Sequence, residues 1–375
     1  MGEEERGTMT GHNHLQDSRP PKVSILLPNL NTRPFLEERM QTILDQTLTD
    51  WELIIVDNYS DDGAWEYFQE CARKDVRIRI SQAPREGMYA NWNNCIRLAR
   101  GEYVYIATSD DTMTPDCLEK MVSALDKYRD CDLCHCCLRV IDEYGSEIEH
   151  WWLKLPTQRF YGDMVFKPHI RKAPLDGLLH TCLSNVYHSI TQLLIRRTVF
   201  EKWGLFKTKW GSRGDFEWEM RISLVCNTFH IPEFLATWRI HPSQATTYNN
   251  ALSEYKDMIE MIFEAVGFHL KNGFRLCRRL DLKYLIQFYE KQAMILERKK
   301  SDMLRHRIQL LWDRVCEWTY KTRYRLARKL GSKERCYNAI TRYALKMLKN
   351  HGLSFETFVS CQRTLDQIEE IINEP

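Results

Sequence analysis

The sequence predicts an α/β protein with a sheet flanked by helices over residues 22–250 and a helical region over 251–375. Up to residue 111, short apolar runs rich in β-branched residues alternate with segments of helical periodicity, which is typical of a parallel sheet with crossover helices. Beyond about residue 250 only helical periodicity remains. A chain of 375 residues, 43% of them hydrophobic, can bury one large core and a smaller one.

The amino-terminal segment and the cysteines indicate the cellular compartment. Residues 1–21 are polar, end in Arg19-Pro20-Pro21 and lack an apolar stretch, so we expect a disordered tail without a secretory signal. The thirteen cysteines then indicate reduced thiols of a cytoplasmic protein. Nowhere do 18 apolar residues follow one another, so we expect no membrane-spanning helix.

The first half of the chain divides into strands and helices in strict alternation. Apolar runs predict strands, and apolar residues at helical spacing predict the segments between them. We expect strands at 23–27, 51–56, 77–82 and 103–107, and helices at 35–44, 64–73 and 90–100.

Polar loops follow three of these strands, at residues 28–31, 57–63 and 109–111. Because open α/β sheets bind ligands at the carboxyl ends of their strands, we expect the loops to converge on a nucleotide site. Asp110 and Asp111 are adjacent carboxylates that repel each other unless Mg²⁺ or Mn²⁺ bridges them to a diphosphate. The alternative is that one of them caps the next helix. The sequence contains neither GxGxxG nor GxxxxGK[ST], so neither a Rossmann fingerprint nor a P-loop is supported.

Several motifs occur in a characteristic order. They are Val-Ser-Ile-Leu-Leu-Pro at 23–28, Gln-Thr at 46–47, Trp-Glu-Leu-Ile-Ile-Val-Asp at 51–57, Ala-Arg-Gly-Glu-Tyr at 99–103 and Asp-Asp at 110–111. This ordered set resembles the family 2 glycosyltransferases of GT-A fold over residues 22–250. The resemblance implies a Rossmann-like mixed sheet, with a nucleotide-binding half at 22–111 and an acceptor half at 112–250.

The resemblance also implies roles in the first half. Asp57 would receive the nucleotide base, and Pro28 and Asn31 would line the base and ribose. Asp110 would lie by the ribose or the metal, and Asp111 would bind Mn²⁺ or Mg²⁺ directly. Arg85 would reach the base or a phosphate; the alternative is a solvated loop arginine.

In the second half, the motif Arg-Gly-Asp-Phe-Glu-Trp-Glu-Met-Arg at 213–221 predicts a helix with Asp215 in its first turn. The resemblance makes Asp215 the base that takes the proton from an acceptor hydroxyl; the alternative is a helix cap. In Arg-Ile-His at 239–241, His241 would complete the metal shell or serve only the structure. The aromatic stretch 151–170 would contact sugar or lie buried. The cysteines at 131–137 fall in a strand, whose alternating faces disfavour a shared metal.

The carboxy-terminal region is strongly basic. Residues 271–350 hold 22 Lys and Arg against 7 Asp and Glu, a net charge of +15, so the rest of the chain carries −13. One apolar face recurs through Leu304, Leu311 and Trp318. Such helices lie on the anionic inner face of a membrane as a peripheral contact, or dock on the catalytic domain. No helix-turn-helix, zinc-finger or RNP signature supports nucleic-acid binding.

These observations predict an inverting, metal-dependent glycosyltransferase. It would move a sugar from a nucleotide-diphospho-sugar donor to a hydroxyl of a glycan or lipid-linked acceptor, in the synthesis of a surface polysaccharide or glycoconjugate. A non-catalytic nucleotide-binding scaffold of the same fold and a sugar nucleotidyltransferase are the alternatives. Donor sugar, base and acceptor depend on pocket shape and are not readable from these motifs.

Overall fold

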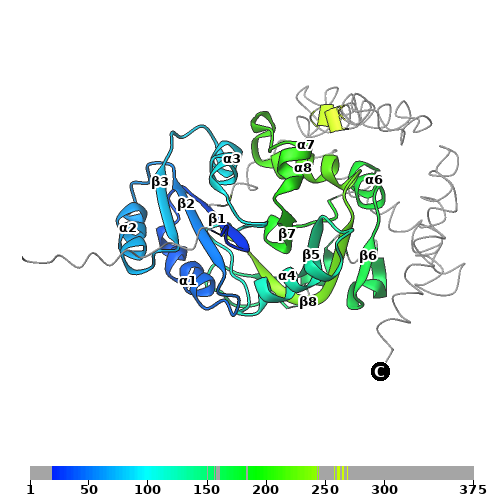
Figure 1. Ribbon diagram of the computed structural model, residues 1–375, viewed down its shortest axis with the longest axis horizontal. Coiled ribbons are helices and arrows are strands. Elements are labelled where there is room, and N and C mark those ends of the chain that lie inside the picture. Colours follow the sequence, from blue (N-terminus) through cyan, green and yellow to red (C-terminus); the bar gives the residue numbers. More distant parts are fainter. Residues whose placement is uncertain are drawn as a thin grey trace, which may run out of the picture.

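An eight-stranded mixed sheet forms the centre of the described chain (Figure 1). The computed structural model describes residues 19–149, 151–155, 157, 161–182, 185–242, 244, 257, 260, 261, 264, 265 and 268. The strand order is β3-β2-β1-β4-β7-β5-β8-β6. The strands are β1 Val23–Asn29, β2 Trp51–Asp57, β3 Ile78–Gln82, β4 Tyr103–Ile106, β5 Leu133–Ile141, β6 His169–Arg171, β7 Leu193–Arg196 and β8 Thr228–Arg239.

The first four strands run parallel, as the alternation predicts. Farther along, the sheet is mixed, because β7 runs antiparallel to both β4 and β5, and β6 runs antiparallel to β8. β5 and β8 are parallel and share the sense of β4, so a single reversed strand joins the two halves of the sheet. The sheet is thus of the mixed kind that the family resemblance implies.

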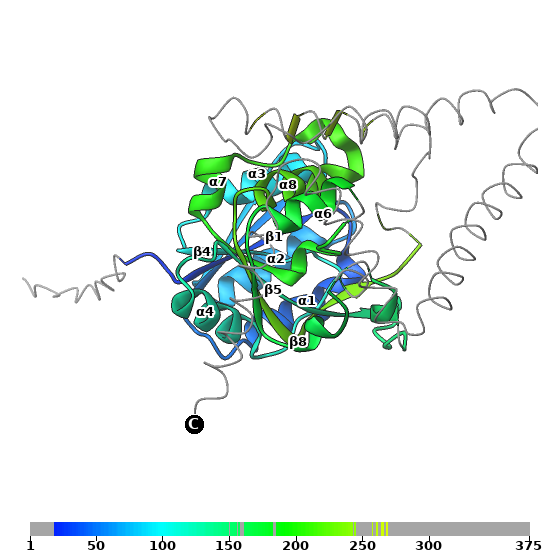
Figure 2. The same cartoon turned by 90° about the vertical axis from the view of Figure 1, so that its right-hand side faces the viewer.

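Helices cover both faces of the sheet. They are α1 Arg33–Leu44, α2 Ala64–Lys74, α3 Met88–Leu98, α4 Cys117–Lys127, α6 Leu175–Cys182, α7 Thr198–Trp203 and α8 Gly214–Ser223, with 3₁₀ turns η1 Trp151–Lys154, η2 Gly162–Phe166, η3 Ile190–Gln192 and η4 Thr208–Arg213. Side chains of α1, α2 and α4 share one apolar core with the sheet, whereas those of α3, α7 and α8 share the other. Figure 2 shows the two layers on opposite sides of the strands.

Local sequence explains the elements near the site. Every residue of β1 and of β2 is buried, as expected for parallel strands with helices on both faces. Helix α1 begins with a proline in its first turn and buries Leu36, Met40 and Ile43 at helical spacing. Gly101 lies in the turn before β4, where a Cβ would stand 2.5 Å from the backbone nitrogen of Ser24. A glycine therefore lets this turn pass against β1.

The carboxy-terminal region lies almost entirely outside the described residues. The predicted basic helices and their membrane contact therefore stay predictions, as does the tail at 1–21, of which only the last positions are described. A few positions after residue 250 are placed: Glu264 pairs with Lys207 at 2.6 Å, and Asp257 pairs with Arg213. Within the described part of the chain, no helix has the length and apolarity needed to cross a bilayer.

Candidate active site

The first part of the site lies where β1 and β2 end side by side. Asn29 and Asp57 are register partners at the last position of the two strands, and both are buried. The Asn29 side-chain amide donates to Asp57 Oδ1 at 2.8 Å, and the backbone N–H of Ser60 donates to Asp57 Oδ2 at 2.8 Å. These bonds fix the carboxylate at the carboxyl edge of the sheet, so the loops after β1 and β2 converge there.

Two further predicted residues shape this loop pair. Asn31 has a positive φ of 54° and donates through its side chain to Asp61 at 2.9 Å, which binds the first loop to the second. Arg85 donates through Nε to the carbonyl oxygen of Asn58 at 2.9 Å, and through Nη2 to Asp61 at 3.3 Å. Arg85 therefore lies against the loop that carries Asp57, with 47% of its side chain exposed. A contact with base or phosphate stays a prediction.

The second part of the site is the loop after β4. The two carboxylates of this loop differ in their surroundings. Asp111 is 2% exposed; its Oδ1 accepts from the backbone N–H of Arg239 at 2.7 Å, and its Oδ2 accepts from the Thr108 hydroxyl at 2.5 Å. Asp110 is more exposed, and its Oδ2 lies 3.0 Å from Nε2 of His241. Asp111 therefore holds the end of β8, whereas Asp110 and His241 face each other.

Burial, together with the negative charge of Asp110, raises the pKa of Asp111 to about 7, against the opposing effect of the hydrogen bonds from Thr108 and Arg239. This carboxyl therefore takes up a proton near neutral pH while no cation is beside it. A divalent cation held by Asp110 would favour the charged form of both side chains.

Helix α1 connects this loop to β8. Arg239 donates through Nε to the Asp110 carbonyl oxygen at 2.7 Å and through Nη2 to Glu38 at 2.6 Å. The ring of His241 packs on Phe35 with the centroids 4.9 Å apart. The first turns of α1 therefore fix the position of His241 opposite Asp110.

Asp215 is the third part of the site. It lies in the first turn of α8 and accepts a hydrogen bond from the Tyr89 hydroxyl at 2.8 Å and one from the backbone N–H of Phe216 at 2.8 Å. Burial raises the pKa of Asp215, and these two hydrogen bonds oppose the shift. Tyr89 belongs to the first turn of α3, where Asn91 donates to the carbonyl oxygen of Val56 at 2.8 Å. Helix α3 thereby joins Asp215 to the end of β2.

Sequence patterns did not indicate several of these contacts. Tyr89 carries no motif, and only the fold brings it to Asp215, which is 126 positions away. Asn29 falls within the predicted polar loop 28–31, and an amide at the end of a strand is a usable signal for a strand-end site. Arg239 belongs to the Arg-Ile-His motif at 239–241, but its contacts with the Asp111 carboxylate and the Asp110 carbonyl oxygen depend on tertiary structure.

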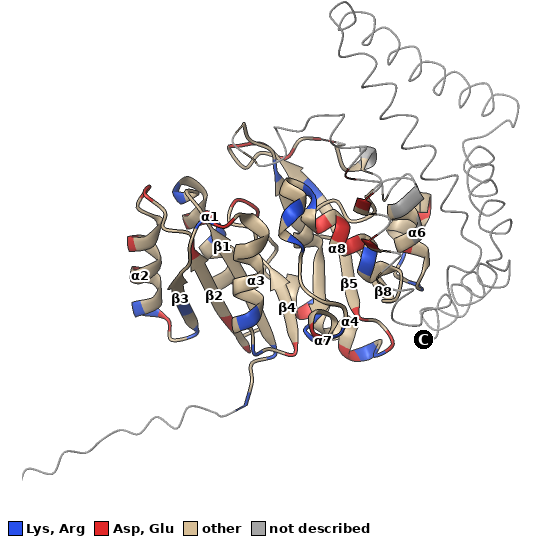
Figure 3. Cartoon of the chain, turned by 90° about the horizontal axis from the view of Figure 1, so that it is seen from above, with Lys and Arg blue, Asp and Glu red and all other residues tan. Residues whose placement is uncertain are grey.

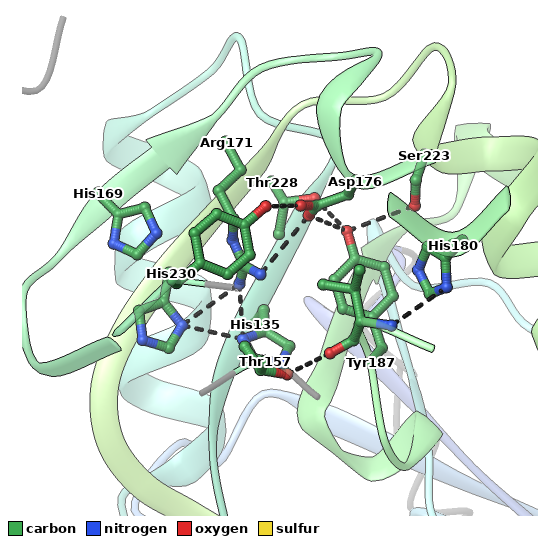
Figure 4. A network of polar contacts seen from close by, with 12 residues as sticks. His135, Thr157, His169, Arg171, Asp176, His180, Tyr187, Ser223, Thr228 and His230 are labelled. Atoms are coloured by element: carbon green, nitrogen blue, oxygen red, sulfur yellow. Dashed lines mark hydrogen bonds and ion pairs between the residues drawn. The ribbon is translucent and has the colours of Figure 1, made fainter. Parts of the chain in front are cut away.

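A buried polar network joins elements of the second half of the sheet (Figure 4). Asp176 of α6 accepts from the Tyr187 hydroxyl at 2.8 Å and pairs with Arg171 at 3.6 Å. Nδ1 of His135 lies 2.9 Å from Nδ1 of His230, on the neighbouring strand. With the hydrogen-bond contact of Arg171 Nη2 with His135 Nδ1 at 2.7 Å, these contacts join α6, β5, β6 and β8.

A cavity of about 20 Å³ lies beside this network, which is room for about one water molecule. Residues that line it include His135, Gln192, His230, Trp152 and Phe234. Trp152 packs edge-on against Phe234 at 5.1 Å, so its ring serves the core of this region. A sugar contact from the aromatic stretch stays a prediction.

The buried histidines predict a measurable acid sensitivity. Burial lowers the pKa of His180 to about 3, whereas an unfolded histidine titrates near 6.5. Below pH 6.5 the unfolded chain therefore binds the extra proton, and the stability that neutral His180 contributes is lost as the pH falls from 6.5 towards 3. Asparagine retains an acceptor for the backbone N–H of Val186, which His180 binds at 3.2 Å. We expect His180→Asn to reduce the pH dependence of the unfolding free energy by up to about 1.4 kcal/mol per pH unit.

This prediction is checked by urea unfolding of both proteins between pH 7 and pH 5. Other groups, including Asp111 with its raised pKa, titrate in the same window but are common to both proteins and cancel in the difference. Parallel stability curves for the two proteins would show that His180 does not titrate as its burial requires.

The fold matches solved glycosyltransferase structures. Staphylococcus aureus TarS (residues 1–349) with UDP superposes with a TM-score of 0.50 and 16% identity over 65% of each chain. The same protein with UDP-GlcNAc gives a TM-score of 0.50 and 16% identity over 72% of this chain and 79% of TarS. The mixed sheet, with three loops at one carboxyl edge, therefore has the GT-A fold.

Sequence comparison specifies the family. The family model for glycosyl transferase family 2 matches residues 24–201, which confirms the family resemblance over that range and supports a transferase enzyme. An uncharacterised glycosyltransferase of Methanocaldococcus jannaschii, MJ1057, is 27% identical over 69% of this chain and 83% of its own. The putative teichuronic acid biosynthesis glycosyltransferase TuaG of Bacillus subtilis is 35% identical over 27% of this chain and 41% of TuaG. The chondroitin synthase of Escherichia coli is 33% identical over 35% of this chain and 19% of the synthase.

Proposed function

We propose that this chain is an inverting, metal-dependent glycosyltransferase that moves a sugar from a nucleoside-diphosphate donor to a hydroxyl of a glycan or lipid-linked acceptor. The observation that carries the proposal is the joining of three elements at one edge of the sheet: Asp57 at the end of β2, Asp110 with His241, and Asp215. Asp215 reaches this edge through Tyr89 and helix α3.

The donor is supported by chemistry at the sheet edge and by TarS, which was solved with UDP and UDP-GlcNAc. Asp57 offers carboxylate oxygens, which are acceptors for base N–H groups. Pro28, Asn31 and Arg85 would flank the base and ribose from the two loops that meet there. The names of TuaG and the chondroitin synthase support a product of the polysaccharide class.

Mn²⁺ or Mg²⁺ fits the pair Asp110 and His241. Two ligand atoms that lie about 2.1 Å from an octahedral ion, at right angles to each other, are about 3.0 Å apart. Oδ2 of Asp110 and Nε2 of His241 are separated by 3.0 Å. The described residues contain no group of three or more His, Cys, Asp or Glu suited to a metal. Two protein ligands leave positions for diphosphate oxygens and water, which is how such ions are commonly held at phosphate sites.

Asp111 was predicted from the resemblance as the direct ligand, and that prediction is still open. We favour Asp110, because both oxygens of Asp111 already accept hydrogen bonds and the residue is 2% exposed. A cation bound by Asp110 and His241 would offset the charge that develops on the leaving diphosphate.

The transfer itself needs one base on the acceptor side. The acceptor oxygen forms a bond to the anomeric carbon, and its proton passes to Asp215. The bond between that carbon and the diphosphate oxygen breaks, and its electron pair goes to the leaving diphosphate. A single displacement of this kind inverts the anomeric configuration. The raised pKa of Asp215 moves this carboxylate towards the operating pH, where a general base is most effective.

The test is thermal unfolding with nucleoside diphosphates and nucleotide sugars, each with and without Mn²⁺. A ligand at 100 times its Kd stabilises the native state by about 2.7 kcal/mol. We expect one nucleotide family to raise Tm by several degrees, with Mn²⁺ required. If no nucleotide raises Tm of the folded protein, the scaffold alternative replaces the proposal.

A second measurement distinguishes transfer from activation. The proposed enzyme releases a nucleoside diphosphate from its donor, whereas a sugar nucleotidyltransferase releases pyrophosphate from a nucleoside triphosphate. We expect the diphosphate, detected when the donor found by thermal unfolding is incubated with the protein and Mn²⁺.

A further inference from the structure

A second carboxyl lies on the same face of α8 as Asp215. Glu219 follows Asp215 by four positions, which is about one turn of the helix, so the two side chains are neighbours. Only 1% of Glu219 is exposed. Figure 3 shows acidic residues gathered on this helix. No role in the proposed reaction has so far been given to this group.

The cations around α8 are paired with a different carboxylate. Arg221 contacts Glu217 at 3.1 Å, and Lys207 contacts the same residue at 2.9 Å. Among the residues that the structure describes, no lysine, arginine or histidine forms an ion pair with Glu219, and its Oε2 is buried without a hydrogen-bond partner. Within the described part of the chain, the buried carboxyl beside Asp215 is therefore not neutralised by a cation.

An ionised carboxylate in that position would be costly. Desolvation of an unpaired charge costs several kcal/mol, and the neighbouring Asp215 would add repulsion. Burial raises the pKa of Glu219 well above its usual value, and the charge of Asp215 raises it further. The groups that face this carboxyl electrostatically are Asp215 on the same helix and Tyr89 on α3, whose own pKa is raised by burial and by both carboxyls.

We propose that Glu219 is a positioning residue for the base: it keeps its proton at neutral pH and supports Asp215 as the only charged carboxyl of the pair. The inference rests on the proposed function, in which Asp215 is the base. With a neutral neighbour, Asp215 stays ionised before transfer and becomes neutral when it receives the acceptor proton. The buried pair thus never carries two negative charges during the reaction.

The test compares Glu219→Gln with Glu219→Leu in the full chain. Glutamine has the shape of the protonated side chain and cannot ionise, so we expect Glu219→Gln to keep most of the turnover and the same acidic limb in the pH profile of kcat/KM. Leucine is neutral but has no polar group, so we expect Glu219→Leu to lose roughly 10- to 100-fold through a misplaced base. Tm of both variants is measured to check that they fold. If Glu219→Leu fails to fold, the pH profile of Glu219→Gln still tests the proposal.

A separate readout needs no activity. The infrared spectrum at pH 7 should contain a carboxylic acid C=O band that disappears in Glu219→Gln. The infrared measurement reports the proton on Glu219 even if no donor or acceptor is found. Failure of the proposed function can therefore be distinguished from failure of this inference about Glu219. An unchanged infrared spectrum would overturn the proposal. So would an acidic limb displaced to lower pH in Glu219→Gln, because removal of a like charge lowers the pKa of the base. Full activity of Glu219→Leu would refute the positioning role.

Discussion

Asp215→Asn is expected to lose 10²- to 10⁴-fold in turnover while donor binding stays nearly unchanged, because general-base catalysis contributes a factor of this size. Asparagine retains an oxygen that can accept from the Tyr89 hydroxyl, which lies 2.8 Å from the carboxylate, but it cannot take up a proton from the acceptor. Transfer is measured as release of nucleoside diphosphate in the presence of acceptor, and donor binding as the nucleotide-dependent rise in Tm.

Tyr89→Phe is the matched control for this experiment. It removes the hydrogen bond to Asp215 and keeps the ring, which stacks on Phe206 with the centroids 5.7 Å apart. Because the hydroxyl stabilises the charged carboxylate, its loss should move the acidic limb of the pH profile to higher pH and leave turnover at alkaline pH largely intact. Near-normal turnover in Asp215→Asn would show that the base lies elsewhere.

The second large effect is expected for Asp110→Asn. If Asp110 and His241 hold the cation, loss of the one carboxylate should weaken Mn²⁺-dependent donor binding by about 100-fold or more, since even residues behind a ligand cost 10- to 100-fold in metal affinity. The readout is the rise in Tm with nucleotide over a range of Mn²⁺ concentrations. Binding of nucleotide without the metal should change little, because Asp57 and its loop are untouched.

Asp111→Asn distinguishes Asp110 as the metal ligand from Asp111, which is the ligand that the sequence resemblance implies. An asparagine oxygen can still accept from the backbone N–H of Arg239, so the end of β8 keeps its anchor. We therefore expect Asp111→Asn to retain more Mn²⁺-dependent binding than Asp110→Asn does. The reverse order would make Asp111 the ligand and Asp110 the supporting residue.

The strands and helices of residues 23–111 could be predicted from sequence because each buried strand is a short apolar run. The prediction of a strand at 103–107 corresponds to β4 at Tyr103–Ile106, and that of a helix at 90–100 to α3 at Met88–Leu98. Strand β7, Leu193–Arg196, went unrecognised, because four residues give too little periodicity to separate a strand from a buried turn. Its direction depends on the neighbours β4 and β5 and is not encoded locally.

The candidate residues of the site could be proposed from sequence, but their contacts could not. Asp57, Asp110 and Asp215 each follow a recognisable pattern, because strand ends and helix starts have their own residue preferences. The two residues Asp110 and Asp111 differ in their contacts, because the backbone of β8 binds Asp111 whereas Asp110 faces His241. This difference depends on tertiary structure. The same holds for Glu219, whose burial beside Asp215 cannot be read from an acidic helix sequence.

The reversed strand β7 also constrains how the chain reaches its native state. Tyr103 of β4 and Arg196 of β7 are 93 positions apart, so the two halves of the sheet are joined by a contact of long sequence separation. During synthesis, β1 to β4 can pair as soon as they emerge, but the inner edges of β4 and β5 have no partner until β7 is made. Closure of this gap is slow compared with local pairing, and until then two strand edges with unpaired backbone groups are open to other chains.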